Sequence, residues 1–151
     1  MIMVSPGEVT SEEAKKLLAM LSMILHDITG SDGRASFNAE EVAHPRACFA
    51  LARNTQGEAV GCGAIRPLAG EKDVAELKRM FASPGTWGVG HALLSFLEGE
   101  ARKRGYREIW LETRKANERA VSFYLRNGYR IRENFGRYVG REEAVCLGRL
   151  L

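Results

Sequence analysis

Two glycines between a predicted strand and a predicted helix form the segment with the clearest potential for ligand binding. The run from Val74 to Phe81 has the residue types of a strand, and the apolar spacing from about Gly90 to Arg104 predicts an amphipathic helix. The first N–H groups of a helix lack partners within it, and the helix dipole makes that end positive. Gly88 and Gly90 leave room for an anion there. The segment therefore predicts a diphosphate site, although a tight turn that needs small residues would have the same sequence.

A second short helix, one predicted strand further along the chain, carries a tyrosine at a defined position. Asn117 is a good N-cap for this helix, and the pair Asn127-Gly128 is a good C-terminal stop. Ala120 and Tyr124 have i,i+4 spacing, so they lie on one face of the helix. This succession of an N-cap asparagine, an alanine, a tyrosine and an Asn-Gly stop is a specific arrangement.

The other predicted elements must position these two segments. A capping box formed by Thr10 and Glu13 predicts a first helix that runs to about His26. Glu98 is expected to pair with Arg102 on the exposed side of the helix after the glycine turn. The remaining predictions are a short helix from Asn38 to Val42, a hairpin of strands Cys48 to Arg53 and Glu58 to Ile65, and strands Arg107 to Thr113, Tyr129 to Ile131 and Ala144 to Leu150. This mixture of antiparallel and crossover elements predicts an α+β or mixed α/β fold.

Together, the glycine turn and the tyrosine helix resemble the GNAT superfamily of N-acetyltransferases. The resemblance is clearest from about Val74 to Ile131, where strand, phosphate turn, helix, strand and tyrosine helix occur in the family's order. Earlier residues correspond by element type only. The resemblance implies a single acetyltransferase-like domain over residues 1–151. The implied fold is a central, mostly antiparallel sheet of about six or seven strands with one splayed parallel pair, flanked by about four helices.

The resemblance implies acetyl-coenzyme A (acetyl-CoA) as the co-substrate, with no metal. The implied cofactor residues are Met80, Phe81 and Ala82 for the pantetheine arm, Gly88, Val89, Gly90, His91 and Ala92 for the pyrophosphate, and Asn117 near the thioester. Gly85 occupies a position where the family usually has Arg or Gln, so we expect the backbone, rather than that side chain, to bind the phosphates. Trp87 would either stack on the adenine or cap the turn.

The implied reaction is direct attack of an amine on the acetyl thioester through a tetrahedral intermediate. An alkyl amine with a pKa of about 10.4 is mostly protonated at neutral pH, so a base is needed. The resemblance assigns this role to Glu76, directly or through a water, and places Tyr124 as the acid that protonates the departing thiolate. A backbone N–H near Met80 would bind the oxyanion. The alternatives are that Glu76 lies on a solvated face or pairs with Lys78 or Arg79, and that Tyr124 packs in the core.

The acceptor pocket of the family usually lies between the loop after the first helix and the loop between the last two strands. Here these loops are Thr29 to Phe37 and Arg132 to Glu143, and the candidate acceptor-binding residues are Arg34, Arg137 and Tyr138. Arginine binds carboxylates through two parallel hydrogen bonds. The loops therefore suggest a small acceptor that bears a carboxylate, with scattered solvated arginines as the alternative.

The composition limits the classes of partner and the cellular compartment that we expect for this protein. The net charge of +3, from scattered basic residues, is too small to indicate a nucleic-acid partner. Cys48, Cys62 and Cys146 are far apart, so we expect reduced thiols and neither a disulfide framework nor a zinc site. The longest apolar stretch, Leu17 to Ile28, is too short to span a bilayer, and the N-terminal sequence lacks a signal-peptide pattern. We expect a soluble cytoplasmic protein with no membrane partner, and the resemblance allows a homodimer.

The predicted function is an N-acetyltransferase that moves an acetyl group from acetyl-CoA to a primary amine of a small molecule. Acetylation of a protein N-terminus or lysine is one alternative, and it would require an open groove for a macromolecule. A module that binds coenzyme A as a sensor without catalysis is another, which the altered turn at Gly85 and Trp87 would suit. An unrelated nucleotide-binding fold with the same phosphate turn is the third alternative.

Overall fold

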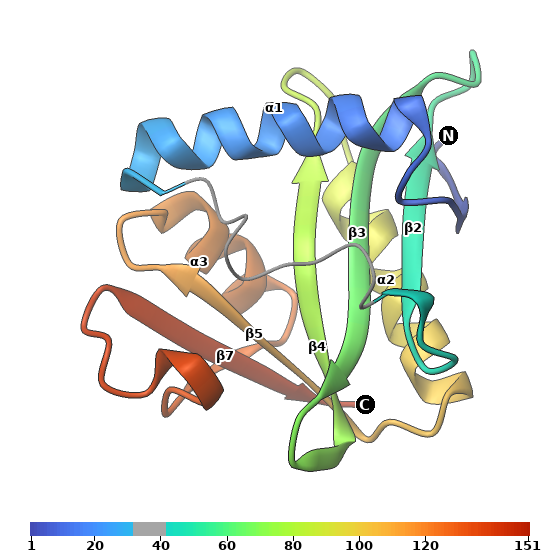
Figure 1. The fold of residues 1–151 in the computed structure, drawn as a ribbon. Helices are drawn as coiled ribbons and strands as arrows, with labels where there is room; N and C mark the ends of the chain where they lie inside the picture. Colours follow the sequence, from blue (N-terminus) through green and yellow to red (C-terminus); the bar gives the residue numbers. More distant parts are fainter. Residues whose placement is uncertain (32–41) are drawn as a thin grey trace.

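A mixed seven-stranded sheet with helices on both faces forms the body of the protein (Figure 1). The computed structural model describes residues 1–31 and 42–151. The strands, in the sheet order β1-β2-β3-β4-β5-β7-β6, are β1 (Met3–Pro6), β2 (Cys48–Arg53), β3 (Ala59–Leu68), β4 (Glu71–Ala82), β5 (Glu108–Arg114), β7 (Ala144–Leu150) and β6 (Arg130–Arg132). The helices are α1 (Glu12–Thr29), α2 (Val89–Lys103), α3 (Glu118–Arg126) and the 3-10 turn η3 (Gly136–Tyr138). The predicted fold class is confirmed, and the helix predicted from residue 38 falls almost wholly outside the described residues.

The parallel pair in the centre of the sheet is splayed, as predicted. Strands β4 and β5 pair only over residues 74–76 and 108–110, whereas all other neighbours in the sheet are antiparallel. Beyond this short contact the two strands diverge, which Figure 1 shows as the angle between them. The second halves of β4 and β5 therefore face each other across a gap in the backbone ladder.

The first helix begins one residue later than predicted and ends three residues later. The N-cap is Ser11 rather than Thr10, because the Ser11 backbone is extended and its hydroxyl accepts a hydrogen bond from the Ala14 N–H at 3.2 Å. The helix continues past His26 to Thr29, since Gly30 is the first residue that adopts the left-handed conformation of a helix stop, with φ of 78°. The capping-box prediction was therefore wrong, because it placed the N-cap one residue too early.

Two apolar cores lie on opposite faces of the sheet. Helix α2 buries Leu93 and Leu97 against Ala75 and Leu77 of β4, and the tyrosines of the α3 region join this core. Helix α1 packs on the other face against a cluster that includes Phe81. Leu77 and Phe81 of β4 are four residues apart but belong to different cores, so the alternation expected of a regular strand is broken between them. Within the described part of the chain, no helix is both long enough and apolar enough to cross a membrane.

Glu98 is buried rather than exposed, so its predicted pairing with Arg102 was wrong. The carboxylate accepts hydrogen bonds from the Tyr129 hydroxyl at 2.9 Å and from the Arg149 guanidinium at 3.0 Å. Arg149 comes from the end of β7, which the helix pattern alone could not place beside α2. The three side chains tie α2, β7 and the residues after α3 together.

Candidate active site

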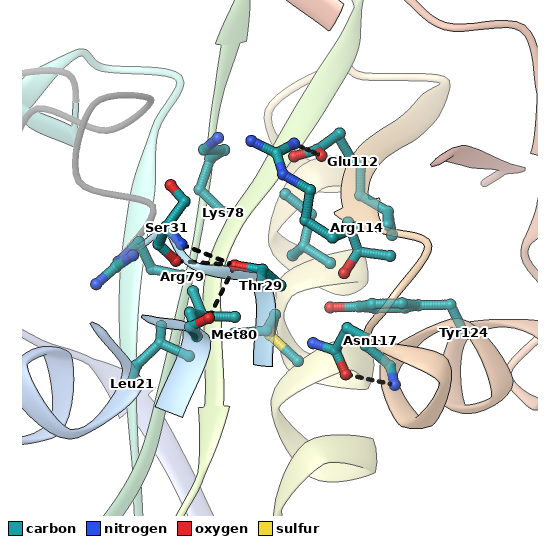
Figure 2. Close-up of a pocket in the computed structure, with 15 residues that line it drawn as sticks. Leu21, Thr29, Ser31, Lys78, Arg79, Met80, Glu112, Arg114, Asn117 and Tyr124 are labelled. Carbon is teal, nitrogen blue, oxygen red and sulfur yellow. Dashed lines mark hydrogen bonds and ion pairs between the residues drawn. The ribbon is translucent and has the colours of Figure 1, made fainter. Parts of the chain in front are cut away.

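A cavity of about 150 Å³ lies where β4 and β5 separate (Figure 2). Residues of α1 line it from one face of the sheet, and residues of α3 line it from the other. The predicted residues Met80, Asn117 and Tyr124 meet there, although they come from β4, the N-cap of α3 and α3 itself. The splay of the two strands thus opens a connection between the two faces of the sheet.

Tyr124 directs its hydroxyl into this cavity, as Figure 2 shows. The side chain is only 8 % exposed, and its ring packs edge-on against Phe123 and Tyr129 at centroid distances of 5.2 and 5.7 Å. Burial raises the pKa of the phenol, because the charged form would be poorly solvated. The tyrosine is therefore both packed in the core and able to serve as a proton donor at neutral pH.

A β-bulge interrupts β4 beside the cavity. Between Cys62 and Ala64 on β3 the pairing skips, so that Arg79 and Met80 on β4 share Gly63 as their opposite neighbour. Arg79 adopts φ of 56°, a left-handed conformation that costs free energy for a residue other than glycine. The bulge lies within the strand segment predicted to bind pantetheine, and the sequence carried no signal for it.

The bulge also turns two consecutive side chains toward α1. The Arg79 guanidinium donates to the Ser22 hydroxyl at 2.6 Å and to the Leu18 carbonyl at 3.2 Å. Lys78 lies on the same face of the sheet, where its amine reaches Tyr138. Met80, which follows Arg79, points to the opposite face and packs into the core under α2. Arg79 thereby fixes α1 across the end of β4.

The predicted diphosphate site lies at the start of α2. Gly88 is the N-cap, has φ of 72° and has open space around its Cβ position. A Cβ on Gly90 would lie 3.1 Å from the Phe123 ring, so a larger residue there would press on the contact between α2 and α3. Val89 is buried and Trp87 is 91 % exposed, so the Trp87 ring does not cap the turn by packing. The Ala92 N–H donates to the Gly88 carbonyl at 3.0 Å, so this amide is not available to a phosphate, and the amides that precede the helical hydrogen bonds are those of residues 88–91.

His91, in the first turn of α2, links this turn to α3. Its Nδ1 lies 2.9 Å from the side-chain oxygen of Asn127, which follows the last residue of α3. Asn117, at the other end of α3, caps that helix by accepting a hydrogen bond from the Ala120 N–H at 3.3 Å. Both ends of α3 are therefore fixed by asparagine side chains, which orients Tyr124 between them.

Glu76 is buried, so the solvated-face alternative was wrong, and its closest ion-pair partner is Arg66, which the sequence analysis had not named. One carboxylate oxygen accepts hydrogen bonds from the Arg66 guanidinium at 2.9 and 3.1 Å, while the other lies 3.9 Å from the Lys78 amine. The partner follows from the β3–β4 register, which places Arg66 directly opposite Glu76. Knowledge of the hairpin register would have been needed to predict it.

A second cavity, of about 440 Å³, lies between the β3–β4 hairpin and the loop that contains η3. Glu76, Arg66, Phe135, Arg137 and Tyr138 contribute to its lining. The predicted acceptor residues from the last loop are therefore beside Glu76, whereas Arg34 lies outside the described residues. Among the residues that the structure describes, no group of three or more His, Cys, Asp or Glu side chains could hold a metal ion.

The four charged residues that line the first cavity, Lys78, Arg79, Glu112 and Arg114, were not predicted to lie there. Lys78 lines the first cavity, and its two-residue spacing from Glu76 in a strand was the signal that could have identified it. Glu112 and Arg114 form an ion pair on β5 and line the same cavity. Burial raises the pKa of Glu112 despite the neighbouring guanidinium. The cavity wall therefore contains charge on both splayed strands.

Comparisons with known proteins agree with this architecture. A family model described as "Acetyltransferase (GNAT) family" matches residues 17–129. The IAA acetyltransferase of Azospirillum brasilense is 33% identical over 125 residues, which are 82% of this chain and 80% of that protein. A crystal structure from Klebsiella pneumoniae, provisionally described as an acyl-CoA N-acyltransferase, has a TM-score of 0.83 at 28% identity and covers 100% of this chain and 98% of that one. The PaiA N-acetyltransferase of Thermoplasma acidophilum, in complex with coenzyme A, has a TM-score of 0.74 at 18% identity and covers 100% and 99% of the two chains.

Proposed function

We propose, from the premise that this chain belongs to the GNAT family of acetyltransferases, that it moves the acetyl group of acetyl-CoA to a primary amine of a small molecule. The observation that carries the proposal is the Tyr124 hydroxyl in a cavity that joins the two faces of the sheet. A relative named as an acetyltransferase and a structural neighbour that contains coenzyme A support the choice of donor. Donor and acceptor can then approach the same point from opposite faces.

The donor would bind on the face that α2 and α3 cover. The diphosphate would accept hydrogen bonds from amides among residues 88–91, where the dipole of α2 favours negative charge. The pantetheine would run along the edge of β4 over Met80, Phe81 and Ala82, because this edge has no partner strand beyond residue 76. Its thioester would then lie near Asn117 and Tyr124, which line the cavity.

The acceptor amine would attack the thioester carbonyl from the α1 face. Its nitrogen forms the new bond to carbon, and a backbone N–H near Met80 binds the oxyanion of the intermediate. The intermediate then breaks its carbon–sulfur bond, and the thiolate takes the proton of Tyr124. The nitrogen loses its second proton as the amide forms, and this proton restores the phenol. A phenol whose pKa is raised by burial retains its proton until a strong base such as a thiolate lies beside it.

Glu76 would take the proton from the ammonium form of the acceptor through a water on its second oxygen. We expect Glu76→Gln to lower kcat/KM about 10²-fold near pH 7 and progressively less toward pH ~9.5, since more acceptor is then free amine. Steady-state rates across this range measure the effect. Thermal unfolding of the variant is the control, because Arg66 loses its anionic partner. A deficit that is equal at every pH would leave Glu76 as an ion-pair partner only.

The overall proposal is tested by incubating the protein with acetyl-CoA and a panel of small primary amines. Release of the coenzyme A thiol, together with mass spectrometry of the amine, would identify acetyl transfer. Transfer to peptide N-termini or lysines in preference to every small amine would favour a macromolecular acceptor. Tight binding of acetyl-CoA with no transfer to any amine would favour the sensor alternative.

A further inference from the structure

The tryptophan beside the proposed diphosphate site is almost fully exposed. Trp87 directly precedes Gly88, the N-cap of α2, and its side chain is 91 % exposed. Among the large apolar side chains that the structure describes as exposed, it is the only aromatic one. Tryptophan is highly buried on average in folded proteins, because its ring carries a large apolar surface. Packing within the described chain therefore does not account for an indole at this position.

The turn that carries Trp87 is fixed to the sheet by hydrogen bonds. The Thr86 N–H and the Thr86 hydroxyl both donate to the Ser83 carbonyl, at 3.3 and 2.6 Å. The Ser83 N–H donates in turn to the Val60 carbonyl of β3 at 2.8 Å. The backbone beside the indole is thus ordered before a ligand binds, so a contact with the ring would cost little loop ordering.

The space around this part of the turn is free of side chains from the neighbouring glycines. Gly85 and Gly88 lie two residues before Trp87 and one residue after it, with φ of 81° and 72°, and a Cβ on either would have no atom within 4 Å. None of the ring contacts between described residues involves Trp87. A second flat ring that stacks on the indole needs an uncovered face of this kind.

The proposed donor has a flat ring on the far side of its diphosphate. Coenzyme A consists of a pantetheine arm joined through a diphosphate to a ribose and an adenine. In the proposed complex the arm runs from amides among residues 88–91 along β4 toward Tyr124. The nucleotide would leave the other end of the diphosphate, outside the cavity, where Trp87 adjoins the same amides. Stacking of a base on an aromatic side chain requires only their flat faces.

We propose that Trp87 stacks on the adenine ring of the coenzyme A donor. The inference rests on the proposed function, because it adds a binding residue for the donor of the same site. Residues of β4 and α3 receive the thioester, and Trp87 receives the nucleotide. A phosphopantetheine without a nucleotide, such as the arm of a carrier protein, cannot make this contact. Trp87 therefore selects a free coenzyme A thioester as the donor.

The first experiment measures the binding of two ligands that differ by the nucleotide. Calorimetry gives the Kd of coenzyme A and of 4′-phosphopantetheine for the unmodified protein and for Trp87→Ala. We expect Trp87→Ala to raise the Kd of coenzyme A about tenfold and to change that of 4′-phosphopantetheine less than about twofold, because only the base loses a stacking partner. Trp87→Phe keeps an aromatic ring, so its Kd for coenzyme A should lie within about threefold of the unmodified value.

A matched control removes an exposed apolar side chain elsewhere. Met23 is 70 % exposed on α1, which covers the other face of the sheet from α2. Met23→Ala should therefore bind coenzyme A as the unmodified protein does. An unchanged Kd of Trp87→Ala for coenzyme A, or equal losses for both ligands, would overturn the inference and leave the proposed function intact. Failure of the unmodified protein to bind coenzyme A at all would contradict both.

The second experiment observes the indole directly by fluorescence, since the chain has only two tryptophans. The ring of Trp110 is already covered, because the guanidinium carbon of Arg132 lies 3.4 Å from its centroid. We expect coenzyme A to quench the emission of the unmodified protein and 4′-phosphopantetheine to leave it unchanged. Trp87→Phe should lose this quenching while it still binds coenzyme A by calorimetry. Quenching that persists in Trp87→Phe, or none in the unmodified protein when coenzyme A is bound, would contradict the stacking.

Discussion

Replacement of Tyr124 by phenylalanine is expected to lower kcat about 10²- to 10³-fold while the KM for acetyl-CoA changes less than about threefold. The substitution removes only the hydroxyl that faces the cavity and retains the ring that packs on Phe123 and Tyr129. Departure of the coenzyme A thiolate would then have no proton donor, whereas donor binding depends on β4 and α2. Steady-state kinetics with both substrates varied would separate the two effects.

Tyr106→Phe is the matched control for this prediction. Tyr106 is also buried, but its hydroxyl donates to the Arg46 carbonyl at 2.9 Å and does not line the cavity. We expect this variant to lose some stability, of the order of 1 kcal/mol for one hydrogen bond, and to keep its kcat. Unchanged turnover of Tyr124→Phe at saturating substrate would exclude Tyr124 as the acid.

A large effect on stability is expected when alanine replaces Gly61, where α2 packs directly on β3. An added Cβ would lie 2.4 Å from a methyl group of Val89 and 2.7 Å from the Phe81 carbonyl oxygen. Neither neighbour can move freely, because Val89 begins α2 and Phe81 belongs to the paired backbone of β4. We expect a loss of about 2–3 kcal/mol in the free energy of unfolding, measured by urea denaturation.

Gly99→Ala makes the same chemical change with the opposite expected sign. Gly99 lies within α2, and a Cβ there would have no atom within 4 Å. Alanine should stabilise the helix by up to about 1 kcal/mol, because glycine is a poor helix former. A Gly61→Ala variant as stable as the unmodified protein would mean that α2 does not approach β3 this closely. The position of the predicted diphosphate site relative to β4 would then be wrong.

Local signals in the sequence were sufficient for most of the sheet. The predicted limits of β2 and β7 agree with the observed Cys48–Arg53 and Ala144–Leu150, because turn residues bound each run. Strand β1 was not predicted, since a four-residue edge strand that ends in Pro6 has too little pattern to recognise. The N-cap of α1 was missed by one position because Thr10 and Ser11 are both good caps.

The candidate site was only partly predictable from the sequence. Some of its contacts depend on how the strands pair and on which distant segments the fold brings together. The meeting of Met80, Asn117 and Tyr124 followed from the resemblance and from the order of elements. The bulge at Arg79 changes which side chains face α1, and no residue in β4 is of a type that predicts a bulge. The contact of Lys78 with Tyr138 joins residues 60 positions apart, so only the folded loop before β7 can bring them together.

A crystal structure with coenzyme A would test the central claim most directly, which is that the splayed strands and the start of α2 hold the acyl donor. The account predicts a diphosphate bound to amides among residues 88–91 and a pantetheine arm along the free edge of β4. The sulfur should lie within hydrogen-bonding distance of the Tyr124 hydroxyl, about 3–4 Å. A coenzyme bound elsewhere, or a sulfur beyond the reach of that hydroxyl with the cavity empty, would contradict it.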